Sequence, residues 1–501
     1  MRQDLNLAMF RTHDIRASSG DLTPELALRL ARAEARYFRE TLSVDAVILA
    51  HDARLSGPRY LGIAADVYQQ AGMDVLWIPG ACSMSHLYFT AMQHPECAAV
   101  MFGASHSPGG DTGRIILGPG VRPIAERIGP GGGLDRLKGF YLEDAGVTAT
   151  RRGRLIGVDN LAAYVEYSME LAGVGPGSLK GIPVLHDYLH GSGGQEMIFA
   201  FEKAGANLTP LHYTPDGRFP LGDPNPVMPD VTREGRIAIE TGDYLTAAIF
   251  DGDADRIDIY SGKGGYLASS FVYAAILPYI LDRNPGHPAG VFADLKSNPL
   301  AVTEMARAGT TVEVIRNGHS QIKNEMYEHP HVLGAVEESA HFYESFMLEG
   351  RGPYCTENTL YVALLVARAW SENPARFKDL IRVQSSTSRE REWGQTFQSE
   401  DARSDALFHV EEYLTTEGLR PMTATRSGLK LGATLLRRGL PFVITQKTVL
   451  QPNWLQVCQR VIPSEPRMAR WEVVGATQEI TARARAEILK ITHQMGALDP
   501  R

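Results

Sequence analysis

The chain has 501 residues, of which 44% are hydrophobic and 22% are charged. A chain of this length exceeds the size of a single hydrophobic core, so we expect about three to four domains. The formal net charge of -8 argues against a nucleic-acid-binding protein, whose surface is normally basic, and any anionic ligand must be bound by local clusters of arginine or lysine.

The N-terminal sequence MRQDLNLAMFRTHDIR contains no continuous apolar segment, so no signal peptide is predicted. The longest apolar stretch, Phe271 to Leu281, is too short to span a bilayer and predicts a core helix. The four cysteines are scattered without CxxC spacing, which is typical of a reducing compartment and gives no zinc signature. We therefore expect a cytoplasmic protein without a membrane partner.

Three segments of the chain repeat one order of elements. The stretches AVILAHDARLSG, IPVLHDYLHGSGG and GVFADLKSNP each predict a strand that ends at an aspartate and continues into a polar loop. A helical pattern ending at Ala-Gly follows each one, and then a second apolar run, MDVLWI, ANLTPL or TTVEVI. Such βαβ units predict mixed or mostly parallel sheets covered by helices, with ligands at the carboxyl ends of the strands. The three aspartates are Asp52, Asp187 and Asp294.

The C-terminal part of the chain has a different pattern. The stretch RARAEILKITHQMG predicts a helix, and the runs NWLQVCQRVI and RWEVV predict strands. The preceding stretch SSTSREREWGQTFQSEDARSD is polar and is predicted to be a linker or exposed surface. We therefore place a smaller α+β domain after about residue 385.

The loop GASHSPGGDTG, residues 103–113, follows a buried-strand pattern that ends at Phe102. Its four glycines are entropically costly to order, which indicates that the backbone around Ser105 must approach another group closely. A plain surface turn is the alternative interpretation.

The motif FDGDADR, residues 250–256, places Asp251, Asp253 and Asp255 at alternate positions. An extended loop can turn the three carboxylates toward one point, where a hard divalent cation such as Mg²⁺ would relieve their repulsion. An EF-hand is excluded because its sixth and twelfth positions hold Arg256 and Gly262 here. A solvated acidic turn remains an alternative. Arg256 suits the anchoring of an anionic substrate or phosphoryl group.

Two further motifs carry polar side chains. In AVEESAH, an extended loop would project Glu337, Ser339 and His341 together, which suits a polyhydroxylated ligand but is also common in surface loops. In RNGHSQIK, the tripeptide Gly318-His319-Ser320 is predicted to start a helix. A histidine at a helix start is often only a capping residue.

The motifs together resemble those of the α-D-phosphohexomutase family, the phosphomannomutase and phosphoglucomutase enzymes. FRTHDIR resembles the FRxYDIRG start, GASHSPGGDTG the TASHNPxxYNG phosphoserine loop, and DGDADR the DGDGDR metal loop. GAVEESAH resembles the GGExSGH sugar loop and RVIPSEP the RPSGTEP phosphate loop, while PDGRFPLGDPNP and RNGHSQIK also match family stretches. Seven matches in family order along nearly the whole chain make coincidence implausible.

The resemblance implies three related α/β domains with mixed sheets and a smaller C-terminal α+β domain around a central cleft. The domains are predicted at residues 1–155 with the phosphoserine loop, 156–263 with the metal loop, 264–384 with the sugar-binding loop and 385–501 with the phosphate-binding loop. The implied activity is a Mg²⁺-dependent phosphosugar mutase that interconverts hexose 1-phosphate and hexose 6-phosphate, of mannose or glucose. The reaction would use a phosphoserine and a sugar 1,6-bisphosphate, the intermediate and activator, and small-molecule sugar phosphates would be the partners.

The family pattern also implies roles for individual residues. Ser105 would carry the phosphoryl group and, through its phosphate, complete a metal site made by Asp251, Asp253 and Asp255. The other catalytic positions are His106, Arg16, Arg256, Lys296 and His319. Substrate-binding positions are Arg11, Glu337, Ser339, His341, Arg460, Ser464 and Arg467.

Several positions depart from the family pattern. The family's lysine in the phosphoserine loop is Ile115 here, so Arg114 or His106 must substitute for it or the chemistry is altered. In the phosphate loop, Ile462 and Pro463 replace residues that supply hydrogen-bond donors. We expect Arg460 to lie in that loop, outside the core, and to carry much of the phosphate binding.

Alanine also replaces glycine in three motifs, at Ala17, Ala254 and Ala340. These departures leave a second hypothesis open. In it, the chain is a divergent relative that binds sugar phosphates as a regulator, or slowly hydrolyses sugar bisphosphates, without efficient mutase activity.

Overall fold

The structure is a computed structural model that describes residues 5–425, 428–461 and 466–498. The chain divides into two compact units, and each is described by itself. The first unit comprises Met1–Leu267, Gly318–Pro330 and Ser339–Asn373, and the second comprises Ala268–Asn317, His331–Glu338 and Pro374–Arg501. None of the helices in the described ranges is long and apolar enough to cross a bilayer.

The first sheet of the first unit has the strand order β1-β5-β4-β2-β3-β7, with β6 paired to β5. It is mixed, because β2 pairs in parallel with β3 and β4 while β5 runs antiparallel to β1 and β4. The strands are β1 (Ile15–Ser18), β2 (Ala46–His51), β3 (Asp74–Ala81), β4 (Ala98–Phe102), β5 (Asp111–Gly118), β6 (Arg122–Ile124) and β7 (Leu155–Gly157).

Four α-helices accompany this sheet, and α1 packs against α2 and α4 around a large apolar core. The first helix starts at a capping residue, since the side chain of Thr23 accepts a hydrogen bond from the Leu26 amide and Pro24 occupies the first turn. The helices are α1 (Pro24–Arg36), α2 (Gly57–Gln70), α3 (Met84–Gln93) and α4 (Leu134–Glu143), with short turns at Leu7–Met9, Tyr37–Thr41, Pro119–Val121 and Pro130–Gly132.

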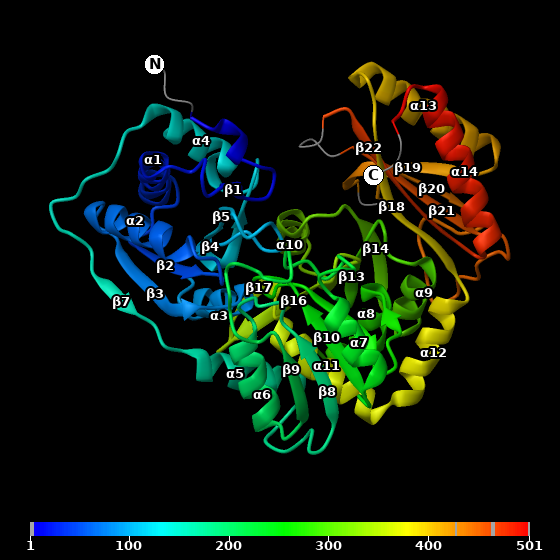
Figure 1. Cartoon of the computed structure of the whole chain (residues 1–501), viewed down its shortest axis with the longest axis horizontal. Helices are drawn as coiled ribbons and strands as arrows, with labels where there is room; N and C mark the ends of the chain where they lie inside the picture. Colours follow the sequence, from blue (N-terminus) through cyan, green and yellow to red (C-terminus); the bar gives the residue numbers. More distant parts are fainter. Residues whose placement is uncertain (1–4, 426–427, 462–465, 499–501) are drawn as a thin grey trace. The chain divides into compact units, whose positions relative to one another are not determined.

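The second sheet of this unit has the order β12-β11-β10-β8-β9 and is also mixed. Its helix α5 packs against α6 and α11 (Figure 1). The strands are β8 (Pro183–Asp187), β9 (Asn207–Leu211), β10 (Thr246–Phe250), β11 (Ile257–Ser261) and β12 (Tyr266–Leu267), and the helices are α5 (Leu161–Ala172), α6 (Gly194–Lys203) and α7 (Arg233–Thr241). Later segments of the same unit are α10 (His319–Glu328), the antiparallel pair β16 (His341–Leu348) and β17 (Arg351–Glu357), and α11 (Thr359–Glu372).

The second unit begins with a parallel arrangement in which β13 pairs with both β14 and β15. The helix α8 packs on α9, α12 and β15 and is buried along most of its length, so the predicted core helix is confirmed. These elements are α8 (Ser269–Arg283), β13 (Gly290–Asp294), α9 (Pro299–Arg307), β14 (Thr311–Ile315), β15 (Val332–Glu337) and α12 (Pro374–Ser385).

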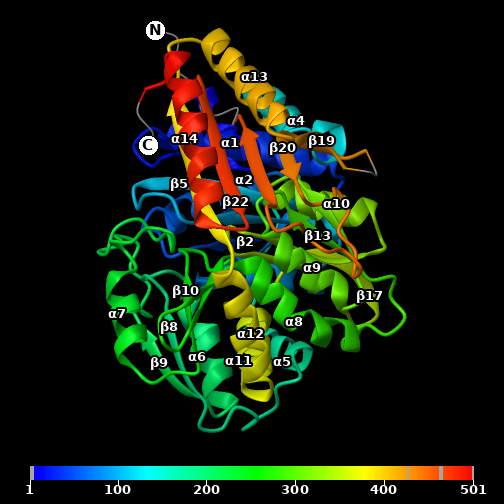
Figure 2. The ribbon, with the colours of Figure 1, turned by 90° about the vertical axis from the view of Figure 1, so that its right-hand side faces the viewer.

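The C-terminal part of the second unit is an antiparallel sheet of order β18-β22-β21-β20-β19. Figure 2 shows α14 running along this sheet beside β22, and α13 packs against α14 and the sheet. The elements are β18 (Ser388–Thr396), α13 (Glu400–Thr416), β19 (Arg420–Ala424), β20 (Lys430–Arg438), β21 (Leu455–Arg460), β22 (Met468–Gly475) and α14 (Gln478–Gln494).

The prediction of a linker before this sheet is wrong, although much of the stretch is exposed or half-buried. The polar stretch forms β18 and the start of α13, and Trp393 packs in the core near Trp471. Charged residues of β18 are paired with opposite charges, as in the contact of Arg389 with Glu472, so the polarity of the stretch is compatible with a strand.

The three predicted βαβ repeats are confirmed. The strand pairs β2/β3, β8/β9 and β13/β14 are parallel, and each connecting helix ends before a glycine with positive φ, namely Gly72, Gly205 and Gly309. The predicted class of three α/β domains and a C-terminal α+β domain is confirmed. The four domain boundaries and the central cleft remain predictions.

Candidate active site

The loop after β4 is held by a buried ion pair at the end of β2. Asp52 accepts the backbone N–H and the Nε–H of Arg54, at 2.9 and 3.0 Å. The Arg54 guanidinium then donates to the backbone oxygens of Ser105 and Ser107, at 2.8 and 2.7 Å. A Cβ at Gly103 would lie 2.6 Å from an Asp52 oxygen, which explains why the first position of this loop is a glycine.

Sequence reasoning found Asp52 as a repeated aspartate but missed Arg54. The only signal was its position two residues after that aspartate. Its side chain is fully buried.

Ser105 sits in the left-handed region with φ 46, a conformation that costs a non-glycine residue on the order of 1–2 kcal/mol. Its hydroxyl donates to Asp251 Oδ2 at 2.8 Å and lies 3.1 Å from His106 Nδ1. A Cβ at Gly252 would lie 2.6 Å from the Ser105 backbone oxygen. The glycine-rich loop therefore does make a close approach, to the loop that carries the aspartates.

Three carboxylates gather in the loop between β10 and β11. Asp251, Asp253 and Asp255 are buried, and oxygen atoms of all three lie within 4.8 Å of one another. Both oxygens of Asp253 and one of Asp255 have no hydrogen-bond partner among the described residues. Burial and mutual repulsion raise the pKa of Asp255 to about 7 and that of Asp253 well above its usual value. The solvated-turn interpretation is therefore wrong.

Positive groups surround the Ser105 loop. Arg256 donates its backbone N–H to Asp251 at 3.2 Å, and Arg16 donates to the Ser107 hydroxyl at 2.6 Å. Arg256, burial and Arg16 lower the pKa of His106 to about 2, so its imidazole is neutral and a very weak base. A neutral ring among arginines leaves a positive field that suits a bound phosphate.

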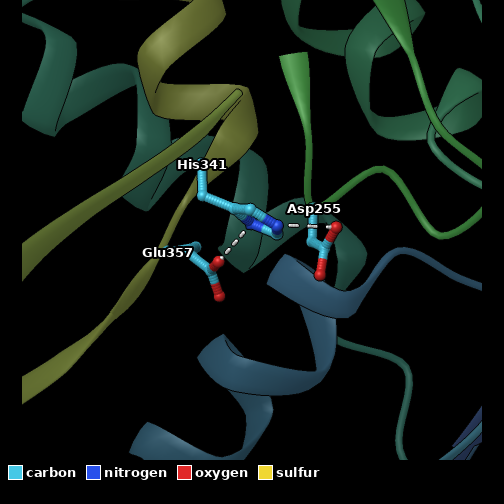
Figure 3. Close-up of side chains that lie close together, drawn as sticks. All are labelled: Asp255, His341 and Glu357. Carbon is cyan, nitrogen blue, oxygen red and sulfur yellow. Dashed lines mark hydrogen bonds and ion pairs between the residues drawn. The ribbon is translucent and has the colours of Figure 1, made fainter. Parts of the chain in front are cut away.

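A second buried cluster lies beside the aspartates (Figure 3). His341 lies between Asp255, whose oxygen is 4.0 Å from Nδ1, and Glu357, whose oxygen is 2.7 Å from Nδ1. Lys323 donates to the other oxygen of Glu357 at 3.1 Å and also contacts the hydroxyl of Tyr88. Burial would raise the pKa of Glu357, but Lys323 and His341 outweigh it and lower that pKa to about 2.

Metal-ligating groups occur in both clusters, but only one fits a divalent cation. In the cluster of Asp255, His341 and Glu357, the Glu357 carboxylate is already neutralised by Lys323. His341 Nε2 accepts a hydrogen bond from Arg256 Nε at 3.0 Å, so that nitrogen is also occupied. The trio of aspartates instead has buried oxygens without partners, and oxygen ligands suit Mg²⁺.

The predicted helix start at His319 is confirmed, because α10 begins at that residue. Its ring lies 5.3 Å from the ring of His13 and 6.4 Å from that of His341. Burial, with Lys323 nearby, holds the pKa of His319 well below its usual value. Arg11 is exposed and Ser339 is half-buried.

The expectation of an extended loop from Glu337 to His341 is wrong. The residues form a turn between β15 and β16, with Ala340 at φ 72. Ala254 in the aspartate loop also has a positive φ, of 53. Two alanines that replace family glycines thus keep the left-handed backbone, whereas Ala17 lies in the extended strand β1.

Arg114 is not free to substitute for the family's lysine. It is buried in the first sheet, donates to Glu34 at 3.2 Å and lies 4.8 Å from the centre of the Phe102 ring. The neighbouring Ile115 is also buried. Of the two substitutes that the sequence leaves open, the arginine is excluded, since its charge is engaged by Glu34.

Further candidate residues belong to the second unit. Glu337 is buried at the end of β15, 3.4 Å from the Asn317 amide. Lys296 is mostly buried, and its amine lies 4.0 Å from Glu392. Arg467 is exposed, and Ser464 lies outside the described residues.

The expectation that Arg460 lies in a loop with its guanidinium free to bind phosphate is wrong. Arg460 is the last residue of β21, and its side chain is only 18% exposed. Its guanidinium donates two hydrogen bonds to Glu392, at 3.0 and 2.8 Å. Arg470 also contacts Glu392, at 3.4 Å, so one carboxylate that the sequence analysis missed engages several cations.

Known proteins match this chain along most of its length. Family models described as phosphoglucomutase/phosphomannomutase, alpha/beta/alpha domains I, II and III, match residues 7–126, 162–264 and 269–385. A phosphomannomutase of Escherichia coli (strain K12) is 28% identical over 383 residues, which cover 75% of this chain and 80% of that protein. A phosphoglucomutase of Neisseria gonorrhoeae is 28% identical over 383 residues, covering 76% and 79%.

Solved structures share the fold at lower identity. A phosphoglucomutase/phosphomannomutase family protein from Burkholderia thailandensis superimposes with a TM-score of 0.76 at 20% identity, over 97% of both chains. An N-acetylphosphoglucosamine mutase from Aspergillus fumigatus superimposes with a TM-score of 0.53 at 11% identity, over 99% of this chain and 97% of that one. The matching domains and relatives lead to one conclusion: this chain belongs to the phosphoglucomutase/phosphomannomutase family and is a phosphosugar mutase.

Proposed function

We propose that the enzyme interconverts the 1-phosphate and the 6-phosphate of a hexose, mannose or glucose, through a phosphoserine at Ser105. The observation that carries this proposal is the 2.8 Å hydrogen bond from the Ser105 hydroxyl to one of three clustered, buried aspartates. A nucleophile, a set of oxygen ligands and the cation of Arg256 meet there, as phosphoryl transfer requires. The cysteine pattern of the sequence supports a cytoplasmic location.

Asp251, Asp253 and Asp255 would hold Mg²⁺, with a phosphate oxygen of phosphorylated Ser105 as a further ligand. The buried oxygens without partners on Asp253 and Asp255 support this assignment. When bound, the ion would neutralise charge that develops on the transferring phosphoryl group. The Aspergillus fumigatus relative was solved in complex with GlcNAc-6P and magnesium.

The reaction consists of two transfers that balance each other. In the first, a sugar hydroxyl oxygen bonds to the phosphorus on Ser105 while the bond to Ser105 Oγ breaks, and the hydroxyl proton passes to a base. The product is a sugar 1,6-bisphosphate, which must reorient in the site. In the second transfer, Ser105 Oγ attacks the other phosphoryl group, the sugar oxygen leaves, and that oxygen takes back a proton.

His341 is the group that we propose for proton transfer in place of the family's lysine. Its pKa is raised, because Asp255 and Glu357 outweigh the effect of burial, whereas His106 has a pKa of about 2. A group with a pKa as low as that of His106 is a very weak base at neutral pH. The resemblance of AVEESAH to the family's sugar loop implied only a substrate-binding role for it.

The remaining roles are proposals as well. Arg16, Arg256 and His106 would surround the transferring phosphoryl group, and His319 would support His341 through ring contact. Sugar hydroxyls would be bound by Glu337 and Ser339. The phosphate that is not transferred would be bound by Arg460, Ser464 and Arg467. Arg11 stays a proposed substrate-binding residue, and Lys296 a proposed catalytic one.

The test is an assay of purified protein with Mg²⁺, glucose 1-phosphate and a trace of glucose 1,6-bisphosphate, combined with peptide mass spectrometry. We expect glucose 6-phosphate to form and phosphate to be found on Ser105. The Ser105→Ala variant should lose turnover, while Ser107→Ala, in the same loop, should still carry phosphate on Ser105. Binding or slow release of inorganic phosphate without isomerisation would support the regulator or phosphatase hypothesis instead.

A further inference from the structure

The stretch PDGRFPLGDPNP, residues 215–226, follows β9, and no role has been assigned to it above. The whole segment lies within the described residues and forms neither helix nor strand. Most of its residues are exposed or half-buried, but four apolar or small ones are buried: Gly217, Phe219, Pro224 and Pro226. This irregular segment is therefore held against other parts of the first unit through a few fixed points.

The segment packs backbone to backbone on one loop of the site and contacts another. A Cβ at Gly217 would lie 2.4 Å from the backbone oxygen of Ala53, in the loop after β2. A Cβ at Gly252 would lie 2.9 Å from Cγ of Pro224, so the segment also reaches the loop of the three aspartates. Both approaches are possible only because a glycine stands at each contact.

Phe219 is the central contact of the segment. The residue is 5% exposed and has a φ of 46, which is a strained conformation for a bulky side chain. Its N–H donates to the Asp216 backbone oxygen and its own oxygen accepts from the Gly222 N–H, both at 2.9 Å. The centre of its ring lies 5.2 Å from Arg54 Cζ, and a Cβ at Gly109 would lie 3.2 Å from its Cδ2.

The Arg54 guanidinium makes five hydrogen bonds, as many as it has N–H donors. One goes to the Asp52 carboxylate, and the others go to four backbone oxygens of the phosphoserine loop, those of Ser105, Ser107, Pro108 and Asp111. Because these bonds lie near the plane of the group, its two faces remain for other contacts. The Phe219 ring lies over one face, where it attracts the cation and excludes water.

We propose that Phe219 is a positioning residue for phosphoryl transfer, which it serves by fixing the guanidinium of Arg54. A strained backbone such as that of Ser105, with a φ of 46, persists only where its surroundings hold it. Arg54 supplies that hold through the loop's backbone oxygens, and Phe219 keeps Arg54 in their plane. The Ser105 hydroxyl is thereby kept 2.8 Å from Asp251. The proposal rests on the proposed function of Ser105 as the phosphorylated residue.

The segment could instead only stabilise the fold, and two leucine variants separate the two roles. Phe219→Leu removes the aromatic face but keeps an apolar side chain. Phe201→Leu removes another buried ring, in α6, which packs on His186 of β8 at 4.6 Å between ring centres. Both variants should lower thermal stability, but a positioning role predicts that only Phe219→Leu affects the phosphoserine loop.

We expect Phe219→Leu to lower kcat by about 10–100-fold while KM changes by less than about threefold, since a displacement of about 1 Å can cost about 100-fold. Hydrogen exchange should become about tenfold faster at two loop amides, those of Ser107 and Asp111, which now donate to backbone oxygens at 2.9 Å. Phe201→Leu should keep the kcat and the loop exchange rates of the wild type.

A lysine at position 54 tests whether Phe219 acts through Arg54. Arg54→Lys keeps a positive charge beside Asp52 but cannot make the planar set of hydrogen bonds, so its kcat should also fall. Adding Phe219→Leu to Arg54→Lys should lower kcat no further, because the group that the ring fixes is absent.

Two glycine variants test the same contact from the phosphoserine loop, and they remain informative if Phe219→Leu does not fold. Gly109→Ala presses a Cβ against the Phe219 ring, whereas Gly110→Ala meets no atom within 4 Å. We expect the kcat of Gly109→Ala to be about tenfold below that of Gly110→Ala, which should match the wild type.

The proposal is overturned if Phe219→Leu keeps the kcat or the loop exchange rates of the wild type, or if Phe201→Leu loses as much kcat. It is also overturned if the losses of Phe219→Leu and Arg54→Lys multiply, or if Gly109→Ala and Gly110→Ala have equal kcat. Peptide mass spectrometry of the wild type distinguishes this failure from that of the proposed function. Turnover without phosphate on Ser105 would overturn the proposed function and the positioning role with it, whereas phosphorylated Ser105 with an unaffected Phe219→Leu would overturn the positioning role alone.

Discussion

The Ser105 hydroxyl donates a hydrogen bond of 2.8 Å to Asp251, which lies 146 residues further along the chain. This contact joins the loop after β4 to the loop after β10. Each loop follows a buried strand, and in each a residue other than glycine has a positive φ, Ser105 at 46 and Ala254 at 53. The backbone strain in both loops is thus found where the proposed nucleophile meets the proposed metal ligands.

Replacing Asp253 tests the metal site. In Asp253→Asn, one buried negative charge is lost, so the metal-free protein should be at least as stable as the wild type while turnover is lost. Saturating Mg²⁺, at about 100 times its dissociation constant, should stabilise the wild type by about 2.7 kcal/mol and the variant much less. Thermal unfolding in EDTA and in Mg²⁺ measures both effects, with exposed Asp243→Asn as the control. An equal stabilisation by Mg²⁺ of the wild type and of Asp253→Asn would contradict the assignment of Asp253 as a metal ligand.

Glu392 should weaken phosphate binding by the second unit. It engages Arg460 through two hydrogen bonds and also contacts Arg470, so an incoming phosphate must displace it. Glu392→Gln removes the competing charge and should lower the dissociation constant for inorganic phosphate about tenfold, which corresponds to about 1.4 kcal/mol. Calorimetric titration measures this change.

The control for that experiment is Glu390→Gln, in the same strand, whose carboxylate contacts Arg485 at 3.1 Å. It should bind phosphate as the wild type does. If Glu392→Gln also leaves phosphate affinity unchanged, Arg460 does not bind the phosphate.

Glu196 should make stability depend on pH. It is buried in α6, one oxygen has no partner among the described residues, and burial raises its pKa to about 7 from 4.5. The folded state therefore keeps a proton that the unfolded state loses above pH 4.5, so this contribution to stability falls between pH 4.5 and 7. Glu196→Gln should remove this loss and be more stable than the wild type at pH 8 by on the order of 2–3 kcal/mol.

Well below pH 4.5, the glutamate is protonated in both states, and the advantage of Glu196→Gln should disappear. Denaturant unfolding at several pH values gives the difference. The control is Glu202→Gln, an exposed position of the same helix, which should show no such trend. A difference between Glu196→Gln and wild type that is constant with pH would contradict the prediction.

Gly193 and Ala254 should be coupled. A Cβ at Gly193 would lie 2.5 Å from the Cβ of Ala254, so Gly193→Ala should cost on the order of 1–3 kcal/mol of stability. In an Ala254→Gly background most of this cost should vanish, because the clashing methyl group is gone. Denaturant unfolding of the four proteins of the cycle measures the coupling.

Gly62→Ala is the matched control for this cycle. It lies in α2, no atom is within 4 Å of the added Cβ, and alanine favours a helix, so the variant should gain about 0.5–1 kcal/mol. Additive costs for Gly193→Ala and Ala254→Gly would show that the two positions do not contact each other.

The sequence predicted what local patterns control. Apolar runs followed by an aspartate, a helix and a terminal glycine identify the three βαβ units, because strand burial and helix capping depend on neighbouring residues. The alternate aspartates from 251 to 255 predict a carboxylate cluster for the same reason. Helix starts such as the one at His319 were likewise predicted from residues next to them.

Only the tertiary structure identified the residues that act through distant partners. Glu357, Arg54 and Glu392 have no motif of their own, and their significance comes from contacts with His341, the Ser105 loop and Arg460. The polar stretch that forms β18 was mispredicted as a linker, because charges that are paired within a strand cannot be told from unpaired charges in a sequence. Hydrophobicity and periodicity report whether a side chain prefers water, but the partner that compensates a buried charge is chosen by the folded chain.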